Sequence, residues 1–271
     1  MATRYSAPQQ TEPRPAVPGS AGRAWLWLAL AVLAGPLLAD AAAPDFAAQA
    51  RKAYVDARTL HQSNLTNLAA AWGFASACFE WAEFATNAPQ RAALAQEGIT
   101  VSRWVIGQTP DLAAGHYYLA MNLGQLARTK SLGALKLVSE MEKQFQTATE
   151  LEAGFDHAGP DRSLGLLYRD APGWPTSVGS RARARRHLQR AAELCPDFPE
   201  NLLSLFETLQ HWGESKTVQG ELPRVARALT RARARLTGDA WAASWADWDQ
   251  RWQVLVAQAT PVPGHEPADR H

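Results

Sequence analysis

Apolar residues recur every three or four positions along most of the chain, and strict two-residue alternation is almost absent. Such a period places apolar side chains on one face of a helix, so the pattern predicts helices and no strands. Residues that favour helices, chiefly Ala, Leu, Arg, Gln and Glu, fill the segments between regularly spaced Pro, Gly and Asn. The pattern predicts an all-α protein with helices at residues 45–62, 65–86, 89–106, 111–127, 133–155, 160–169, 180–194, 199–212, 221–236 and 239–258.

The predicted helices group into pairs, and the pair formed by 160–169 and 180–194 has the clearest repeat signature. Leu164 and Gly165, followed by Tyr168, resemble the first helix of a tetratricopeptide repeat, where a small residue lets the paired helix pack closely. The second helix of that repeat and its terminating proline are matched by Ala184, Leu188, Ala191 and Pro196.

Other segments fit the same pattern as further pairs. They are 111–127 with 135–155, 199–212 with 221–236, and a degenerate earlier pair within 65–106. Because each pair buries its apolar face only against its neighbours, three or four pairs are enough for a self-supporting solenoid. The resemblance implies a right-handed α-solenoid of tetratricopeptide-like helix pairs that occupies residues 42–258.

Tryptophan is the unusual count in the composition, at 11 residues of 271. Trp241, Trp245, Trp248 and Trp252 are separated by four, three and four positions, which places them on one helix face. We expect their helix to cap the apolar flank of the last repeat. The alternative is an aromatic ladder that stacks against a ligand.

The N-terminal segment has the pattern of a secretory signal. Arg23 precedes the short apolar run 25–34, and a small-x-small cleavage pattern ends at Ala41. We therefore expect a signal peptide at 1–41 and a bacterial-type periplasmic location. The alternative is inner-membrane anchoring through an uncleaved segment, although the run is short for a span. The Pro-rich tail 259–271 is predicted to be disordered.

Composition and motifs exclude several function classes. A formal net charge of +1 lacks the basic surplus of a general nucleic-acid binder. The sequence has no phosphate-binding glycine loop, no catalytic serine elbow and no metal-ligand spacing among its seven histidines. We therefore expect a non-catalytic protein without cofactor or metal; an enzyme would have to use an isolated acid such as Glu80 or Glu207. Cys78 and Cys195 either form a disulfide after export or remain inert thiols.

The most specific local feature is the segment 171–180, which is inserted between the two helices of the central repeat. Its two prolines and two glycines predict a stiff loop that carries Trp174. Ser180 is a favourable N-cap for the following helix, whose free N–H groups attract anions. Together with Arg162 and Arg181, Trp174 would form an anion pocket with an aromatic wall. The alternative is that Trp174 fills a gap between helices while the arginines form a solvated face.

In tetratricopeptide repeats the first helix of each pair lines a concave groove. This geometry places Tyr117, Met121 and Arg162 on the groove, which suits a peptide or a modest organic ligand. The complete set of candidate ligand- or partner-binding residues is Tyr117, Met121, Arg162, Tyr168, Trp174, Ser180 and Arg181.

An exported chain of such helix pairs, with a Gly- and Pro-rich insertion before Gly179 and Ser180, resembles the T component associated with tripartite ATP-independent periplasmic (TRAP) transporters. The resemblance covers about residues 60–236. It implies a non-catalytic partner of a periplasmic solute-binding protein, forming homo-oligomers with a groove or pore for a hydrophobic or acidic solute. Some members carry a lipid anchor, for which this N-terminal segment has no cysteine.

Two functional hypotheses follow. In the first, the protein is an adaptor that binds a protein partner, such as a solute-binding protein, through the groove and the loop 171–180, with Arg162 orienting a carboxylate. In the second, it is a carrier that encloses an organic acid or a hydrophobic small molecule between Tyr117, Arg162 and Trp174.

Overall fold

The computed structural model describes residues 45–130 and 133–260, and its elements in these ranges are α-helices. They are α1 (Phe46–Ser63), α2 (Leu68–Glu83), α3 (Ala88–Gln108), α4 (Ala113–Ala127), α5 (Ala134–Leu151), α6 (Phe155–Asp170), α7 (Arg181–Leu194), α8 (Pro199–His211), α9 (Ser215–Arg235) and α10 (Asp239–Ala259). Each predicted helix has a counterpart. The predicted signal peptide and the tail beyond residue 260 lie outside the described residues.

Two helix starts differ from the prediction by five residues or more. The α9 helix begins at Ser215 and runs through Pro223, because burial of Val218 in the core offsets the lost backbone hydrogen bond. The α6 helix begins at Phe155, but residues 156–158 form a left-handed turn. The right-handed part of α6 therefore begins close to the predicted residue 160.

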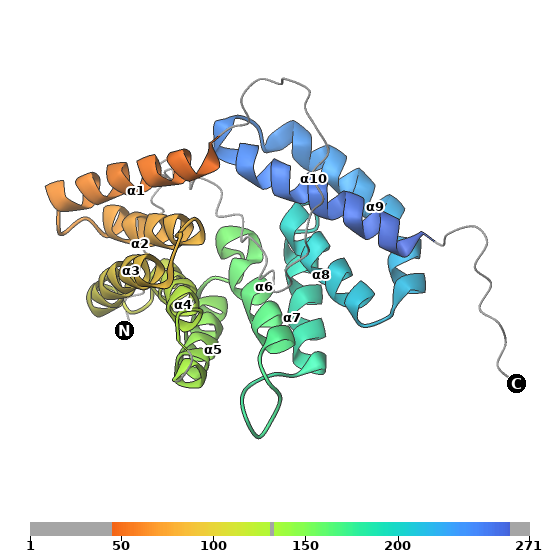
Figure 1. Cartoon of the computed structure of the whole chain (residues 1–271), viewed down its shortest axis with the longest axis horizontal. Coiled ribbons are helices and arrows are strands. Elements are labelled where there is room, and N and C mark those ends of the chain that lie inside the picture. Colours follow the sequence, from red (N-terminus) through yellow and green to blue (C-terminus); the bar gives the residue numbers. More distant parts are fainter. Residues whose placement is uncertain (1–44, 131–132, 261–271) are drawn as a thin grey trace, which may run out of the picture.

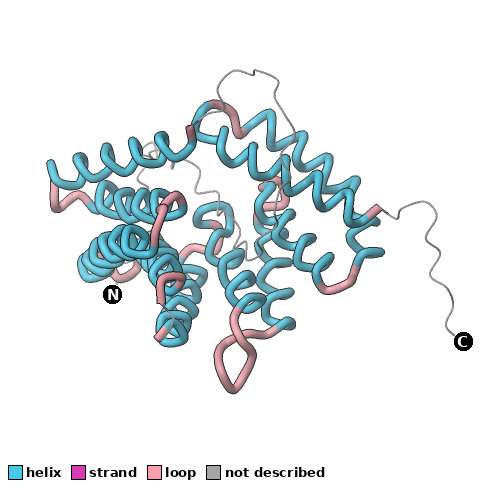
Figure 2. Tube along the Cα trace, in the orientation of Figure 1, coloured by secondary structure: helices cyan, strands magenta, loops and turns pink. Residues whose placement is uncertain are grey.

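Consecutive helices pack as pairs: α2 with α3, α4 with α5, α6 with α7, and α8 with α9. Figure 1 shows these pairs following one another in a curved row, and Figure 2 shows that mostly short loops connect them. The α1 helix packs on α2 at one end, and α10 packs on α8 and α9 at the other. The protein is thus an all-α solenoid, as predicted.

Close helix approach within a pair depends on a glycine. A Cβ atom on Gly165 of α6 would lie 2.6 Å from the Cγ atom of Leu188 on α7. Leu188 is itself fully buried in the core, so it has little room to move. The small residue of the repeat signature therefore serves the predicted purpose.

The tryptophan stripe of α10 caps the last repeat. Trp248 is fully buried, and its indole N–H donates a 2.8 Å hydrogen bond to Glu200 of α8. Its ring meets the Phe198 ring edge-on at 5.6 Å. Trp241, Trp245 and Trp252 pack, partly buried, against the same apolar cluster. The alternative of a ligand-stacking ladder is therefore wrong.

Both cysteines are free thiols. Cys78 is fully buried in α2 and Cys195 is partly buried at the end of α7. Burial raises the pKa of both thiols, which favours the unreactive protonated form. None of the helices in the described ranges is long and apolar enough to cross a bilayer.

Candidate functional site

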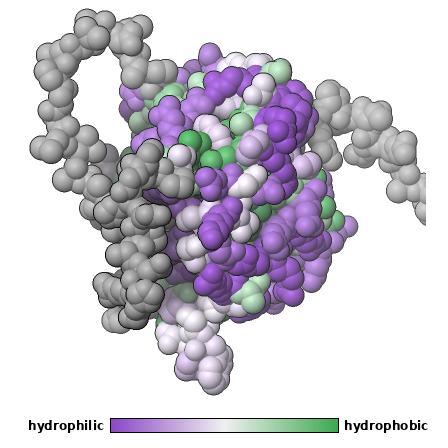
Figure 3. Space-filling model, turned by 90° about the vertical axis from the view of Figure 1, so that its right-hand side faces the viewer, coloured by the Kyte–Doolittle hydropathy of each residue, from purple (hydrophilic) through white to green (hydrophobic). Residues whose placement is uncertain are grey.

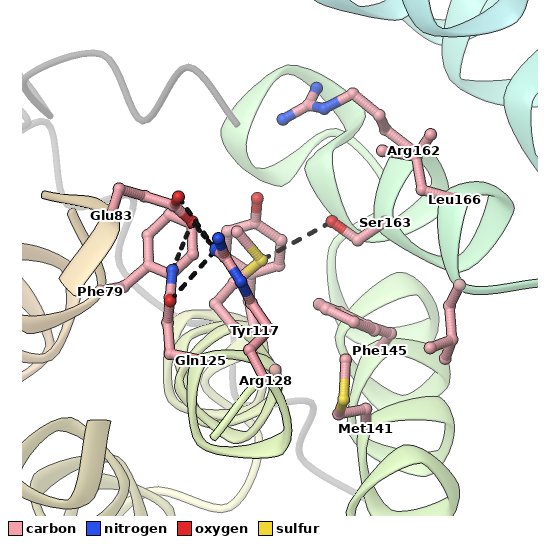
Figure 4. Close-up of a pocket in the computed structure, with 13 residues that line it drawn as sticks. Phe79, Glu83, Tyr117, Gln125, Arg128, Met141, Phe145, Arg162, Ser163 and Leu166 are labelled. Atoms are coloured by element: carbon pink, nitrogen blue, oxygen red, sulfur yellow. Dashed lines mark hydrogen bonds and ion pairs between the residues drawn. The ribbon is translucent and has the colours of Figure 1, made fainter. Parts of the chain in front are cut away.

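Three of the predicted groove residues, Tyr117, Met121 and Arg162, lie around one crevice. Figure 4 shows Tyr117 at its centre, with Glu83 of α2 on one side and Phe145 of α5 on the other. The crevice has a volume of about 30 Å³, which is enough for one or two water molecules. The sequence therefore predicted which residues meet, but their crevice is too narrow for an organic ligand.

The charged groups at one side of this crevice are already paired. Arg128 donates to the two carboxylate oxygens of Glu83 at 3.1 and 3.0 Å. The Gln125 side-chain amide also donates to Glu83, and Arg91 donates to the Gln125 side-chain oxygen at 2.6 Å. This cluster connects α2, α3 and α4, so it holds the repeats together.

Arg162 is built into the interior of the protein. Only 2% of its side chain is exposed. Its guanidinium donates to the Asn201 side chain at 2.8 Å, lies 3.4 Å from Asp156 and stands 5.4 Å from the Phe198 ring centroid. The expectation that Arg162 orients a ligand's carboxylate is therefore corrected: its donors are used by contacts within the fold.

Next to Arg162 the backbone is strained. Residues 156–158 have φ angles of 47°, 55° and 62°, in the left-handed region that non-glycine residues avoid. Asp156 accepts a 2.8 Å hydrogen bond from the Tyr117 hydroxyl, and His157 stacks on Phe198 with ring centroids 4.2 Å apart. Burial raises the pKa of Tyr117 well above its usual value, and the Asp156 carboxylate adds to this, so the hydroxyl remains a donor.

Three other predicted residues lie away from the crevice. Tyr168 is buried under the guanidinium of Arg183, which stands 4.1 Å from its ring centroid. Ser180 caps α7 by accepting the backbone N–H of Arg183 at 3.3 Å, as its N-cap pattern predicted. Arg181 is paired with Glu214 at 2.9 Å. Arg181 is thus paired within the protein rather than left to bind an anion.

The loop 171–180 projects from the body of the protein between α6 and α7 (Figure 1). Trp174 lies on this loop and is 89% exposed. Both expectations for Trp174 are wrong, because it fills no gap between helices and does not join Tyr117 and Arg162 at the crevice. The reason is that the loop closes on itself: Gly179 N–H donates to the Pro172 carbonyl at 2.8 Å.

The structure also contains a larger cavity that sequence analysis did not predict. Its volume is about 610 Å³, within the range of small-molecule sites. The walls come from α1, the C-terminal part of α2 and the first half of α10. Figure 1 shows the N-terminal ends of α1 and α10 approaching each other across the top of the molecule. We call this cavity the α1–α10 hollow.

Glu80 is the residue of the hollow that the sequence could have indicated. It lies in α2, where most residues are apolar, and α2 contributes Phe79, Glu80, Glu83 and the adjoining Phe84 to the lining. A carboxylate in so apolar a helix is a signal for a polar cavity. The contribution of α1 and α10 to the same cavity has no local signal, because it depends on the curvature of the whole solenoid.

Comparison with known proteins identifies the fold. No protein-family model and no curated protein sequence matches the chain. Among solved structures, the chain is similar to a thermophilic tetratricopeptide-repeat (TPR) protein from Thermus thermophilus, with a TM-score of 0.58 and 16% sequence identity. The match covers 78% of this chain and 92% of that chain. Similarity at this level of identity establishes the fold alone, and the chain accordingly has a TPR-like fold.

Proposed function

We propose that the protein is a non-catalytic adaptor that binds a protein partner through its solenoid surface and the loop 171–180. The observation that carries this proposal is Trp174, which is 89% exposed. A tryptophan left in water is unfavourable, whereas tryptophans buried in interfaces are among the residues that contribute most to binding.

The loop that carries Trp174 suits a docking role. Besides the bond between Gly179 and Pro172, the Ser180 N–H donates to the Tyr168 carbonyl at 2.8 Å and the Thr176 N–H donates to the Gly173 carbonyl at 3.0 Å. A loop already held in one shape loses little entropy on binding. Residues 171–180 contain no charged side chain, and in Figure 3 they form the pale projection at the bottom of a largely hydrophilic face.

The partner that we propose is a periplasmic solute-binding protein of a TRAP-type transporter. This choice rests on the resemblance of residues 60–236 to the T component and on the secretory pattern of residues 1–41. We accordingly propose a periplasmic protein, with inner-membrane anchoring through an uncleaved N-terminal segment as the alternative. The same resemblance leads us to expect a homo-oligomer.

The proposal is tested by titrating the purified protein against the TRAP-type solute-binding proteins encoded in the same genome, using biolayer interferometry. We expect Trp174→Ala to weaken binding about tenfold or more, because buried interface tryptophans commonly contribute about 2 kcal/mol or more. Thr176→Ala on the same loop is the matched control and should bind like the wild type. Failure of the wild type to bind any of these proteins would refute the partner, and equal binding by Trp174→Ala would refute the docking role.

A pair of glycine variants tests the shape of the loop while keeping Trp174. A Cβ on Gly179 would lie 2.1 Å from the Ala171 carbonyl oxygen, whereas a Cβ on Gly173 would meet its nearest neighbour at 3.8 Å. Gly179→Ala should therefore weaken partner binding and Gly173→Ala should not. If Gly179→Ala binds as tightly as the wild type, the fixed shape of the loop has no part in docking.

The second candidate function, a small-molecule carrier, is supported by the α1–α10 hollow. Its volume of about 610 Å³ suits an organic ligand, unlike the crevice at Tyr117. The organic acid expected from the sequence would need a free cation in the cavity. The side chains of the hollow favour a ligand of the opposite charge.

A further inference from the structure

The α1–α10 hollow combines apolar walls with an excess of negative charge. Phe46 of α1, Phe79 of α2 and the adjoining Phe84 supply aromatic surface, and alanines of α1 and α10 add further apolar wall between polar residues. The charged residues that line it are Lys52, Asp56, Glu80, Glu83, Asp239 and Asp247. Five of the six are acids, so the cavity complements a cation with an apolar body.

Four of these six charged residues form ion pairs within the protein, whereas Glu80 and Asp239 have no ion pair among the described residues. Lys52 pairs with Asp56 at 2.6 Å, Glu83 with Arg128 at 3.0 Å, and Asp247 with Arg251 at 3.0 Å. Within the described residues, the hydrogen bond that Glu80 accepts comes from the neutral hydroxyl of Ser76, at 3.2 Å. Glu80 is therefore a carboxyl group on the cavity wall that lacks a counter-ion.

We propose that the α1–α10 hollow binds a small organic cation, whose ammonium group pairs with Glu80 while its apolar body contacts Phe46, Phe79 and Phe84. Aromatic faces attract cations as well as apolar groups, so the walls and the carboxylate select the same ligand. This site is separate from the loop that carries Trp174, and it does not rest on the adaptor function.

The environment of Glu80 gives binding a characteristic pH dependence. Burial raises the pKa of Glu80 to about 8, against the weaker lowering effect of the Ser76 hydroxyl, and the Asp156 carboxylate raises it further. The charged and titratable groups around it are Lys52 and Asp56 on α1, Glu83 on α2, Tyr117 on α4, Arg128 just after α4, Asp156 on α6, and Asp239 and Asp247 on α10.

The sign of the pH effect follows from this pKa. Below about pH 8 the free protein holds a proton on Glu80, and the arriving cation must displace it. Cation affinity should therefore rise as the pH increases from 6 to 8 and level off above that. A ligand that does not pair with Glu80 has no such dependence.

The test uses phenethylammonium as the probe, with 3-phenylpropanoate and phenethyl alcohol as matched anionic and neutral analogues. Isothermal titration calorimetry with the whole protein should detect phenethylammonium and give at least about tenfold weaker binding for the other two. Glu80→Gln should weaken the binding of phenethylammonium about tenfold or more and remove the pH dependence of that binding. Glu221→Gln, on α9 and outside the hollow, is the control and should change neither.

A second variant keeps the test decisive if Glu80→Gln folds poorly. Ala243 is an exposed residue of α10 that lines the hollow, so Ala243→Trp should block the cavity without disturbing the core. Trp174→Ala should leave cation binding unchanged, which separates this site from the adaptor surface. The proposal is overturned if phenethylammonium fails to bind at millimolar concentration or if the anion binds equally well. It is also overturned if neither Glu80→Gln nor Ala243→Trp weakens the binding of phenethylammonium.

Discussion

Arg162 links α6 and α8 through one buried guanidinium. Its contacts with Asp156 on α6, Asn201 on α8 and the Phe198 ring hold the left-handed turn at the start of α6 against the start of the next repeat. A charge placed there is costly unless its hydrogen bonds are satisfied, so the contacts depend on one another.

Replacing this residue should destabilise the protein strongly. We expect Arg162→Ala to lower the free energy of unfolding by about 3–5 kcal/mol, because it removes the buried counter-ion of Asp156 and the hydrogen-bond donor to the Asn201 side-chain oxygen. The control is Arg224→Ala, whose side chain is 47% exposed beside Glu221 and whose effect should stay within about 0.5 kcal/mol. Urea unfolding followed by circular dichroism measures both. Equal losses for the two variants would contradict a structural role for Arg162.

At the residue scale, the sequence indicated which residues line the crevice but not whether their side chains are free to bind a ligand. The resemblance to tetratricopeptide repeats, whose first helices line a groove, placed Tyr117, Met121 and Arg162 on the inner face of their helices, and they do meet. It could not show that Arg162 is buried against partners within the fold, because one of these partners, Asn201, lies 39 residues further along the chain. The same limit applies to Trp174, whose exposure depends on how the loop closes.

At the scale of elements, Gly165 sets the distance between α6 and α7. We expect Gly165→Ala to destabilise the protein by about 1–3 kcal/mol, because its Cβ would overlap the buried side chain of Leu188. Gly220→Ala in α9 is the matched control: no atom lies within 4 Å of its Cβ position, so helix propensity should make that variant more stable by up to about 1 kcal/mol. Thermal unfolding of the two variants should show opposite shifts. A Gly165→Ala variant as stable as the wild type would show that the pair can separate without cost.

Helices were predictable because their signals are local. Amphipathic spacing and regular Pro and Gly positions lie within or beside each segment, and they predicted the approximate position of each helix in the described residues. The start of α9 was missed because Gly220 and Pro223 were interpreted as a break, whereas tertiary burial of Val218 extends the helix by about two turns before Pro223. The left-handed turn at residues 156–158 has no local signal, since it depends on contacts from α4 and α8.

At the scale of the whole molecule, curvature brings the two ends of the solenoid to one cavity. The α1 helix contacts α2, and α10 contacts α8 and α9, yet α1 and α10 both line the hollow. Curvature is the sum of small rotations between successive pairs, which no short segment encodes. Sequence reasoning therefore identified the solenoid and its cap but not the hollow between its ends.

The solenoid should also unfold unevenly, because its apolar interior is divided. One cluster joins the α6–α10 end around Trp248, and another is centred on α4 and α5. Each repeat is stabilised mainly by its immediate neighbours. Loss of the α10 cap should therefore lower the local stability of α8 and α9, which it covers, more than that of α2 and α3 at the other end of the solenoid.

Trp248→Ala tests this directly. The substitution removes a fully buried indole and its hydrogen bond to Glu200, which should cost about 3–5 kcal/mol. Native-state hydrogen exchange should then accelerate in α8, α9 and α10, while α2 and α3 keep the protection of the wild type. Trp174→Ala is the control, because a side chain that is 89% exposed contributes little to stability and should leave exchange unchanged throughout. If Trp248→Ala instead accelerates exchange equally in all helices, the repeats form one cooperative unit and α10 stabilises the far end of the solenoid as much as its own.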